Sequence, residues 1–256
     1  MRPGHSRGET GFPPELMRRI RITLAYDGAP FHGWQVQPEL PTVQGTLEQV
    51  VSEIEGKPVQ VAGSGRTDAG VHALAQVAAF TIDNPIPLAN LKRAMNRLLP
   101  STIRILVTEE VPADFHPRFN AKAKSYEYRI CRGEVCSPFD WPYVLHYPYP
   151  LAEDRMAELA QTFVGEHDFT AFAAADDRDA EGASKVRTIF SSALDASAGS
   201  IIYRVRGSGF LKHMVRNIVG TLIEAGKGNI DEVTVLPEKS GPTVPAKGLF
   251  LVSVEY

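Results

Sequence analysis

The segment AGSGRTDAGVHALA (Ala62–Ala75) separates two predicted strands and carries an Arg-Thr-Asp triplet among glycines. Gly63, Gly65 and Gly70 permit sharp turns and close backbone approach, so the loop can aim one side chain at a ligand. The carboxylate of Asp68 stands beside an arginine and two hydroxyl side chains, and we expect it to stay ionised at neutral pH. A tight hairpin in which Asp68 only caps a turn is the alternative interpretation.

Hydrophobic patterns on both sides of this loop predict a unit of six elements over residues 20–112. Ile20, Ile22 and Leu24 alternate with polar residues, which is typical of a half-buried strand, and a later helical stripe ends at Gly56. The predicted order is strand, helix, strand, strand, helix, strand. These elements are Arg19–Asp27, Thr42–Glu55, Val59–Ala62, Leu74–Thr81, a helix that follows Pro87 and ends before Pro100, and Thr102–Val111.

The same order recurs over residues 113–256, although the two halves share no sequence repeat. Its elements are Ala123–Arg132, Leu151–Val164, Val186–Ala196, Ser200–Ser208, Phe210–Gly226 and Leu249–Glu255. Two βαββαβ units predict an α+β fold of two ferredoxin- or RRM-like halves, with antiparallel sheets, helices on one face and an active-site cleft between the halves. Residues 1–19 are rich in Pro, Gly and Arg and are expected to form a flexible extension, and Asp176–Ser184 an acidic connector.

Composition places this chain of 256 residues among ordinary globular proteins, with 43% hydrophobic and 22% charged residues. Its apolar runs are shorter than the ~20 residues of a membrane span, and residues 1–19 lack the apolar core of a signal peptide. We therefore expect a cytoplasmic protein without a membrane partner. Cys131 and Cys136 are too few to form a zinc site or a disulfide framework.

The formal net charge of −3 hides an uneven distribution. Asn84–Arg104 and Gly199–Ile223 each contain four Lys or Arg residues and no acid, and Phe115–Ile130 is also basic. Such segments are long enough to bind several phosphates of a nucleic acid. Three merely solvated faces remain the alternative interpretation.

The residues GSGRTDAGVHA (Gly63–Ala73) resemble the active-site motif of the tRNA pseudouridine synthase A family, with Asp68 at the position of its catalytic aspartate. Further similarities follow in the family's order over roughly residues 20–256. They are LAYDGAPFHGWQ (Leu24–Gln35), TVQGTLE (Thr42–Glu48), FHPRFNAKAKSYEYRI (Phe115–Ile130), VGEHDFTAF (Val164–Phe172), GFLKHMVRNIVGTL (Gly209–Leu222) and VPAKGLFL (Val244–Leu251).

This resemblance implies an isomerase that converts uridine to pseudouridine at positions 38, 39 and 40 of the tRNA anticodon stem-loop. It also implies a homodimer in which the second subunit helps to hold the tRNA. The reaction moves no electrons and transfers no group away, so we expect neither a cofactor nor a metal. Asp68 attacks C1′ of the ribose or removes the C2′ proton, and the sequence leaves both routes open.

The resemblance also assigns partners to Asp68. It implies that Arg216 pairs with the catalytic aspartate, that Tyr126 stacks on the target uracil or removes its C5 proton, and that Leu249 lies under the base. Without the resemblance, Tyr126 is an ordinary sheet aromatic and Arg216 lies on a solvated helix face.

Three further residues are candidates for substrate binding. Arg66, two residues before Asp68, is placed to enter the space that an extruded base leaves. Lys212 and His213 fall on the polar half of the helix predicted for Phe210–Gly226.

Two other functions compete with this one. A non-catalytic, RRM-like tRNA-binding module would share the topology, but no RNP1 octamer lies on either third strand. A metal-dependent hydrolase would need clustered ligands, whereas the seven histidines are scattered and show no His-x-x-x-His spacing.

Overall fold

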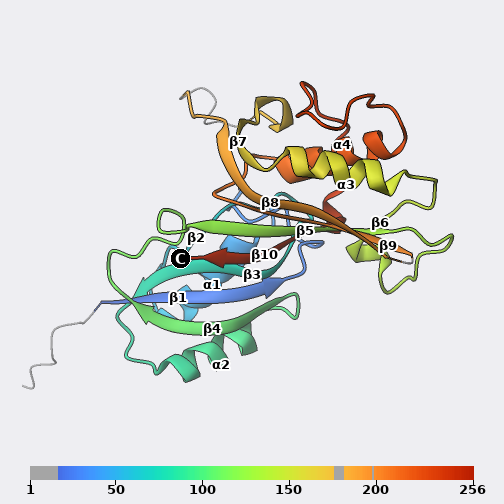
Figure 1. Ribbon diagram of the computed structural model, residues 1–256. Coiled ribbons are helices and arrows are strands. Elements are labelled where there is room, and N and C mark those ends of the chain that lie inside the picture. The colour runs from blue at the N-terminus through green and yellow to red at the C-terminus, as the bar shows by residue number, and fades with distance from the viewer. Residues whose placement is uncertain (1–16, 176–181, 198) are drawn as a thin grey trace, which may run out of the picture.

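In the computed structural model, the described residues are 17–175, 182–197 and 199–256. Within them, ten strands form one sheet in the order β4-β1-β3-β10-β5-β9-β8-β7, with β2 paired to β3 and β6 paired to β5 (Figure 1). The pairs β10–β3 and β5–β6 are parallel and the others are antiparallel. The predicted α+β class is therefore confirmed.

The first half follows the predicted order, and local signals fix its first helix. Thr42 caps the helix N-terminus by accepting a hydrogen bond from Gly45 N at 3.2 Å, and Gly56 ends the helix with φ 79°. The elements are β1 (Arg18–Tyr26), α1 (Val43–Glu55), β2 (Ala62–Gly63), β3 (His72–Ile82), α2 (Leu88–Leu98) and β4 (Ile103–Val111).

The strand predicted for Val59–Ala62 is wrong in extent, because only Ala62 and Gly63 pair with β3. Side chains of α1 bind the backbone there instead of a neighbouring strand. Val59 N donates to Ser52 Oγ at 2.9 Å, and Val61 N donates to the carboxylate of Glu48 at 3.0 Å.

The second half contains two short strands that the sequence patterns did not predict, β6 and β7. Its helix α3 is shorter than the predicted Leu151–Val164. The elements are β5 (Ala123–Cys131), η1 (Trp141–Tyr143), β6 (Leu145–His146), α3 (Glu153–Thr162), β7 (Gly165–Asp168), η2 (Thr170–Phe172), β8 (Val186–Ser197), β9 (Ser200–Gly207), α4 (Met214–Gly226), η4 (Ala246–Gly248) and β10 (Leu249–Glu255). Most of the predicted extension 1–19 and of the acidic connector 176–184 lies outside the described residues.

Helix α4 begins at Met214, four residues later than predicted. The N-cap residue His213 has a left-handed backbone with φ 62°, so the right-handed helix cannot extend through it toward Phe210. One residue of the predicted polar face, Asn217, is buried. Its side chain donates from Nδ2 to the Phe172 carbonyl oxygen at 2.8 Å and accepts from Thr243 Oγ1 at 2.6 Å.

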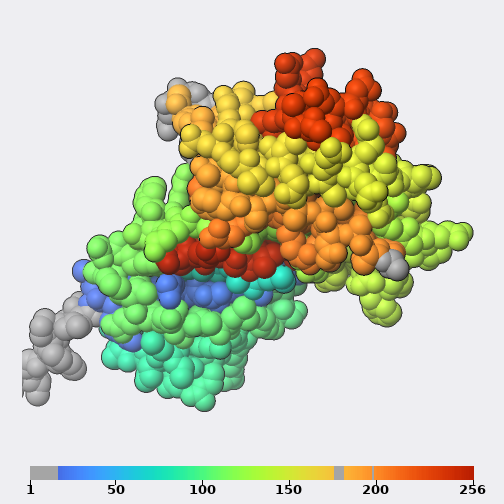
Figure 2. Space-filling view, in the orientation of Figure 1, coloured from blue at the N-terminus to red at the C-terminus, as the bar shows by residue number. Residues whose placement is uncertain are grey.

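The expectation of two separate sheets is wrong. A parallel pairing of two residues, Phe250 with His72 and Leu251 with Ala73, joins the N-terminal strands to the C-terminal ones. In Figure 1, α1 and α2 lie against the N-terminal strands, and α3 and α4 lie against the C-terminal strands. Figure 2 shows β10, in red, between the blue-green and the orange parts of the surface. One hydrophobic core continues across this join.

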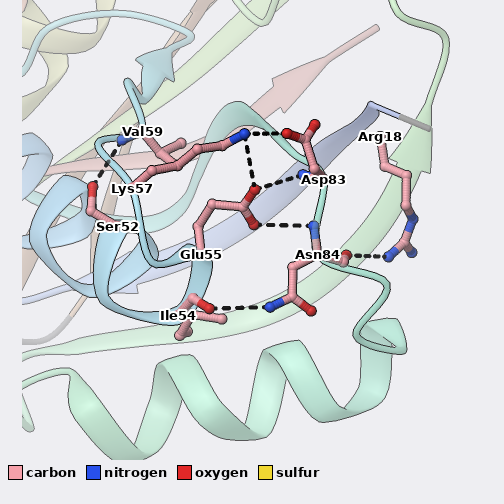
Figure 3. A network of polar contacts seen from close by, with 8 residues as sticks. All are labelled: Arg18, Ser52, Ile54, Glu55, Lys57, Val59, Asp83 and Asn84. Atoms are coloured by element: carbon pink, nitrogen blue, oxygen red, sulfur yellow. Dashed lines mark hydrogen bonds and ion pairs between the residues drawn. The ribbon is translucent and has the colours of Figure 1, made fainter. Parts of the chain in front are cut away.

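A polar network fixes the end of α1 to the end of β3 (Figure 3). The Glu55 carboxylate accepts hydrogen bonds from Asp83 N at 2.7 Å and Asn84 N at 3.2 Å. Asn84 Nδ2 donates back to the Ile54 carbonyl oxygen at 3.2 Å, and Lys57 pairs with Asp83. This end of the sheet is stabilised without any residue that lines the pocket described below.

The longest described α-helices have 13 residues, so none of the helices in this part of the chain can cross a membrane.

Candidate active site

The loop that carries Asp68 lies between β2 and β3 and is held by neighbours from β1 and from the Phe31–Gln35 turn. Trp34 N donates to the Thr67 carbonyl oxygen at 3.0 Å, and the hydroxyls of Thr67 and Tyr26 are hydrogen-bonded at 2.8 Å. Gly70 has φ 75°, and the turn closes with Val71 N donating to the Asp68 carbonyl oxygen at 3.1 Å. The main chain around Asp68 is therefore fixed on both sides.

Two other glycines of this loop do not have a positive φ, and glycine is needed there because neighbouring atoms pack closely against the backbone. A Cβ at Gly63 would lie 2.5 Å from the indole ring of Trp34, and a Cβ at Gly65 would lie 2.8 Å from Lys124 Nζ. The sequence predicted that glycines shape this loop, and the structure assigns the positive φ to Gly70 among them.

The carboxylate of Asp68 contacts residues from the far end of the chain. Arg216 Nη1 donates to Asp68 Oδ2 at 3.2 Å, while Arg216 Nε donates to the Val244 carbonyl oxygen at 2.8 Å. His213 Nε2 lies 3.6 Å from the same carboxylate oxygen. The side chains of Asp68 and Arg216 are 26% and 15% exposed, so the pair is only partly accessible to solvent.

The neighbouring arginine and the two hydroxyl side chains were expected to compensate the charge of Asp68, and the structure shows that this expectation is wrong. The Ser64 hydroxyl is hydrogen-bonded to Gln76 Oε1 at 2.5 Å, and the Thr67 hydroxyl is bound to Tyr26. The guanidinium of Arg66 is exposed and donates to Gln35 Oε1 at 3.1 Å. The loop turns these side chains away from the carboxylate, and α4 supplies the positive charge instead.

His213 is the residue directly before α4. Its backbone is left-handed, and its ring lies beside the Asp68 carboxylate. Burial lowers the pKa of His213 below its usual 6.5, and the Arg216 and Lys212 charges lower it further against the opposing effect of Asp68. The ring is therefore neutral at pH 7.

A pocket of about 590 Å³ opens in front of the carboxylate, and Tyr126, Phe210 and Leu249 give it an apolar wall. The rings of Tyr126 and Phe210 meet edge to face with centroids 5.0 Å apart. Burial raises the pKa of Tyr126 well above its usual value, and the charge of Asp68 adds to this shift. The phenol is therefore protonated at neutral pH.

Positive charge surrounds the rest of the pocket. Asp68 is the single acid among the described lining residues, which also include the four cations Arg66, Arg118, Lys124 and Lys212. Such a wall attracts a polyanion. The sequence patterns placed Arg118 and Lys124 in a basic segment but did not single them out, because no local pattern shows that these side chains line the same pocket as Asp68.

The pocket brings together six of the seven residues that the sequence singled out, and the seventh, Arg216, lies directly behind Asp68. Two other cations of the basic segment Gly199–Ile223 are already paired with acids. Arg204 pairs with Glu127 at 3.1 Å and Arg206 pairs with Glu255 at 2.6 Å, whereas Lys212 lines the pocket and donates to a main-chain carbonyl oxygen.

Among residues 17–175, 182–197 and 199–256, no three His, Cys, Asp or Glu side chains are grouped in a way that would hold a metal ion. Both cysteines are free thiols.

The fold and the pocket together define an α+β protein with a carboxylate–guanidinium pair at the base of an electropositive pocket. The family model described as tRNA pseudouridine synthase matches residues 22–120 and 159–256. The chain therefore belongs to the tRNA pseudouridine synthase family, and it is an isomerase, as the resemblance implied.

Its relatives agree with this assignment. The chain is 75% identical over 240 residues to tRNA pseudouridine synthase A of Solibacter usitatus (strain Ellin6076), which covers 94% of this chain and 100% of that one. It is 43% identical over 250 residues to tRNA pseudouridine synthase A of Lacticaseibacillus casei (strain BL23), with the same coverage. Among solved structures, an archaeal box H/ACA sRNP Nop10-Cbf5 complex aligns with 81% of this chain and 43% of that chain at 11% identity, with a TM-score of 0.39.

Proposed function

We propose that this protein isomerises uridine to pseudouridine at positions 38, 39 and 40 of the tRNA anticodon stem-loop, with Asp68 acting at the ribose of an extruded uridine. The observation that carries the proposal is the Asp68 carboxylate, held 3.2 Å from Arg216 at the base of a pocket with an apolar wall and a cationic rim. Membership of the tRNA pseudouridine synthase family supports the substrate class and the reaction.

In the proposed reaction the N1–C1′ bond breaks, the uracil turns in the pocket, and C5 bonds to C1′. C5 then loses its proton and N1 gains one, so the product is an isomer and no redox partner is needed. Asp68 either attacks C1′ as a nucleophile or removes the C2′ proton. In both routes Arg216 orients the carboxylate, because its Nε is itself fixed by the Val244 carbonyl oxygen.

The apolar wall would hold the detached uracil between bond breaking and bond making. We assign Tyr126 to stacking on the base and Leu249 to the opposite apolar contact, since both line the pocket. The raised pKa of Tyr126 keeps its hydroxyl protonated in the free protein, which favours stacking over removal of the C5 proton. Burial of the uracil would also exclude water, which would otherwise trap C1′.

Extrusion of the target base costs a few kcal/mol. We assign Arg66 to the space that the base leaves, because its exposed guanidinium lies at the pocket two residues before Asp68. Lys212 and His213 also line the pocket and are assigned to the substrate. Lys212 donates to the Ala175 carbonyl oxygen at 3.1 Å, and among the described residues no acid pairs with it.

The two halves have separate tasks in this proposal. Residues 20–112 supply the Asp68 loop, and residues 113–256 supply the base-binding and arginine-bearing elements. We further propose a cytoplasmic homodimer in which the second subunit holds the body of the tRNA. Its stoichiometry can be measured by light scattering with and without tRNA.

The decisive experiment maps pseudouridine in unmodified tRNA transcripts treated with wild-type protein or Asp68→Asn. We expect modification at the three positions with the wild type and none with the variant, which should still bind tRNA. Full activity of Asp68→Asn would refute the catalytic assignment. A non-catalytic binding module predicts instead that even the wild type releases no tritium from 5-tritiated uridine while tRNA binding is intact.

A further inference from the structure

Lys124 reaches from β5 to the loop that carries Asp68. Its Nζ donates a hydrogen bond to the Ser64 carbonyl oxygen at 2.6 Å. The glycine at position 65 accommodates this lysine, because a Cβ there would lie 2.8 Å from Nζ. The amine of Lys124 therefore fixes the main chain of the Asp68 loop to the C-terminal half at Ser64.

This amine has no carboxylate partner among the described residues, although its side chain is only partly exposed. Burial, and then the Arg118 guanidinium, lower the pKa of Lys124 to about 8. On the adjacent strand β9, by contrast, Arg204 and Arg206 each pair with an acid. An unpaired cation that is partly removed from water costs stability. Its presence in the pocket is therefore better explained by an anionic ligand than by the fold alone.

The remaining hydrogen-bonding capacity of Lys124 points to the same conclusion. A lysine ammonium has three N–H donors, and the Ser64 carbonyl oxygen occupies one of them. Lys124 lines the pocket together with Asp68 and Arg118. The charge of Asp68 is already engaged by Arg216, so it does not neutralise the lysine. In RNA the anionic oxygens are those of the phosphates.

We propose that Lys124 is a substrate-positioning residue that fixes the Asp68 loop through the Ser64 carbonyl and binds a phosphate oxygen of the RNA with its other N–H donors. The identity of the ligand rests on the proposed function, whereas the contact with the loop does not. A bound phosphate stabilises the ammonium form, so RNA affinity falls as pH rises through about 8.

Three other titratable side chains that line the pocket do not produce this pH dependence. Burial lowers the pKa of His116 and of His213 below the usual 6.5, so both rings are already neutral at pH 7. Tyr126 is shifted in the opposite direction, because burial raises its pKa above the range of the measurement. Arg118 keeps its charge throughout.

The test measures equilibrium binding of an unmodified tRNA transcript from about pH 7 to pH 9 and from about 50 to 200 mM salt. We expect wild-type affinity to fall across this pH range. Lys124→Arg should keep the affinity at pH 7 and lose the pH dependence, because arginine stays charged. Lys124→Met should bind about tenfold more weakly, with a salt slope smaller by about 0.9.

Gly65→Ala separates the two roles of the lysine. The methyl group of the new alanine should displace Lys124 Nζ from the Ser64 carbonyl oxygen and leave the charge of the lysine in the pocket. We expect a lower kcat with an unchanged salt slope. If the role of Lys124 were only structural, its replacement would change neither the salt slope nor the pH dependence of tRNA binding.

Three results would overturn the inference: wild-type binding independent of pH, an unchanged salt slope in a folded Lys124→Met, or equal losses of affinity in Gly65→Ala and Lys124→Met. Each can be found while the wild type forms pseudouridine normally. Failure of the proposed function is a different result, namely absence of pseudouridine with the wild type.

Discussion

Arg216 Nη1 donates to Asp68 Oδ2 at 3.2 Å across a sequence separation of 148 residues. The contact joins the loop between β2 and β3 to the first turn of α4, one from each half of the chain. Because Arg216 also donates to the Val244 carbonyl oxygen, its guanidinium is fixed in two directions. The carboxylate is thereby oriented before any substrate arrives, which is the condition under which an electrostatic pair contributes most to catalysis.

Arg216→Lys should lower kcat by about 100-fold, because an ammonium cannot replace the two directed hydrogen bonds of the guanidinium. Tritium release under single-turnover conditions measures this effect. Arg155→Lys is the matched control: its guanidinium also donates to a main-chain carbonyl, that of Ala225 at 3.4 Å, but it lies outside the pocket. Equal losses in the two variants would show that Arg216 acts only through stability.

Tyr126→Phe should keep kcat/KM within about tenfold of the wild type, whereas Tyr126→Leu should lose about 100-fold or more. The reason is that the raised pKa leaves the phenol protonated, so its ring and not its hydroxyl is expected to serve the reaction. Steady-state kinetics on one tRNA transcript compares the variants. An inactive Tyr126→Phe that still binds tRNA would instead assign the C5 proton transfer to the hydroxyl.

Arg66→Ala should leave the melting temperature unchanged and lower kcat/KM by about 100-fold, since the exposed guanidinium is expected to replace the extruded base. Fluorescence of a 2-aminopurine beside the target uridine should rise less than with the wild type. Gln35→Ala, which removes the hydrogen-bond partner of Arg66, is the control and should retain most activity. Normal extrusion by Arg66→Ala would remove this role.

Gly63→Ala should destabilise the protein by about 1–3 kcal/mol, because its methyl group would lie 2.5 Å from the Trp34 ring. Differential scanning calorimetry should show a fall of about 2–4 °C for each kcal/mol. Gly209→Ala is the control, since the nearest atoms to its Cβ lie at 3.8 Å. A melting temperature of Gly63→Ala equal to that of Gly209→Ala would contradict the packing argument.

Thermal stability should fall as pH drops from about 7 to 5.5, in part because of His72. This ring is 1% exposed and accepts a hydrogen bond from Gly28 N at 3.1 Å. Burial lowers the pKa of His72 despite Asp27, so the folded state binds fewer protons than the unfolded state below pH 6.5. His72→Gln should therefore show a shallower fall, and His167→Gln on the edge strand β7 should follow the wild type. Parallel curves for all three proteins would contradict this explanation.

The order of elements was predictable because its signals are local. Thr42 and Gly56 delimit α1, alternation of apolar residues marks β1 and β5, and each signal acts within a few residues. The Asp68 loop was also predictable, since its glycines and its motif are contiguous in sequence. The strand predicted at Val59 failed because α1 side chains bind its backbone, which no local pattern reveals.

The sequence by itself determined most of the helices and strands and the loop that carries the carboxylate, because short-range backbone preferences and side-chain periodicity decide these. Only the tertiary structure decided that β3 and β10 join both halves into one sheet and that Lys124 reaches the Ser64 carbonyl. The tertiary structure also decided that His213 has a left-handed backbone and that its ring lies beside Asp68. These features depend on contacts between residues distant in sequence, whose free energies arise only when the whole core packs.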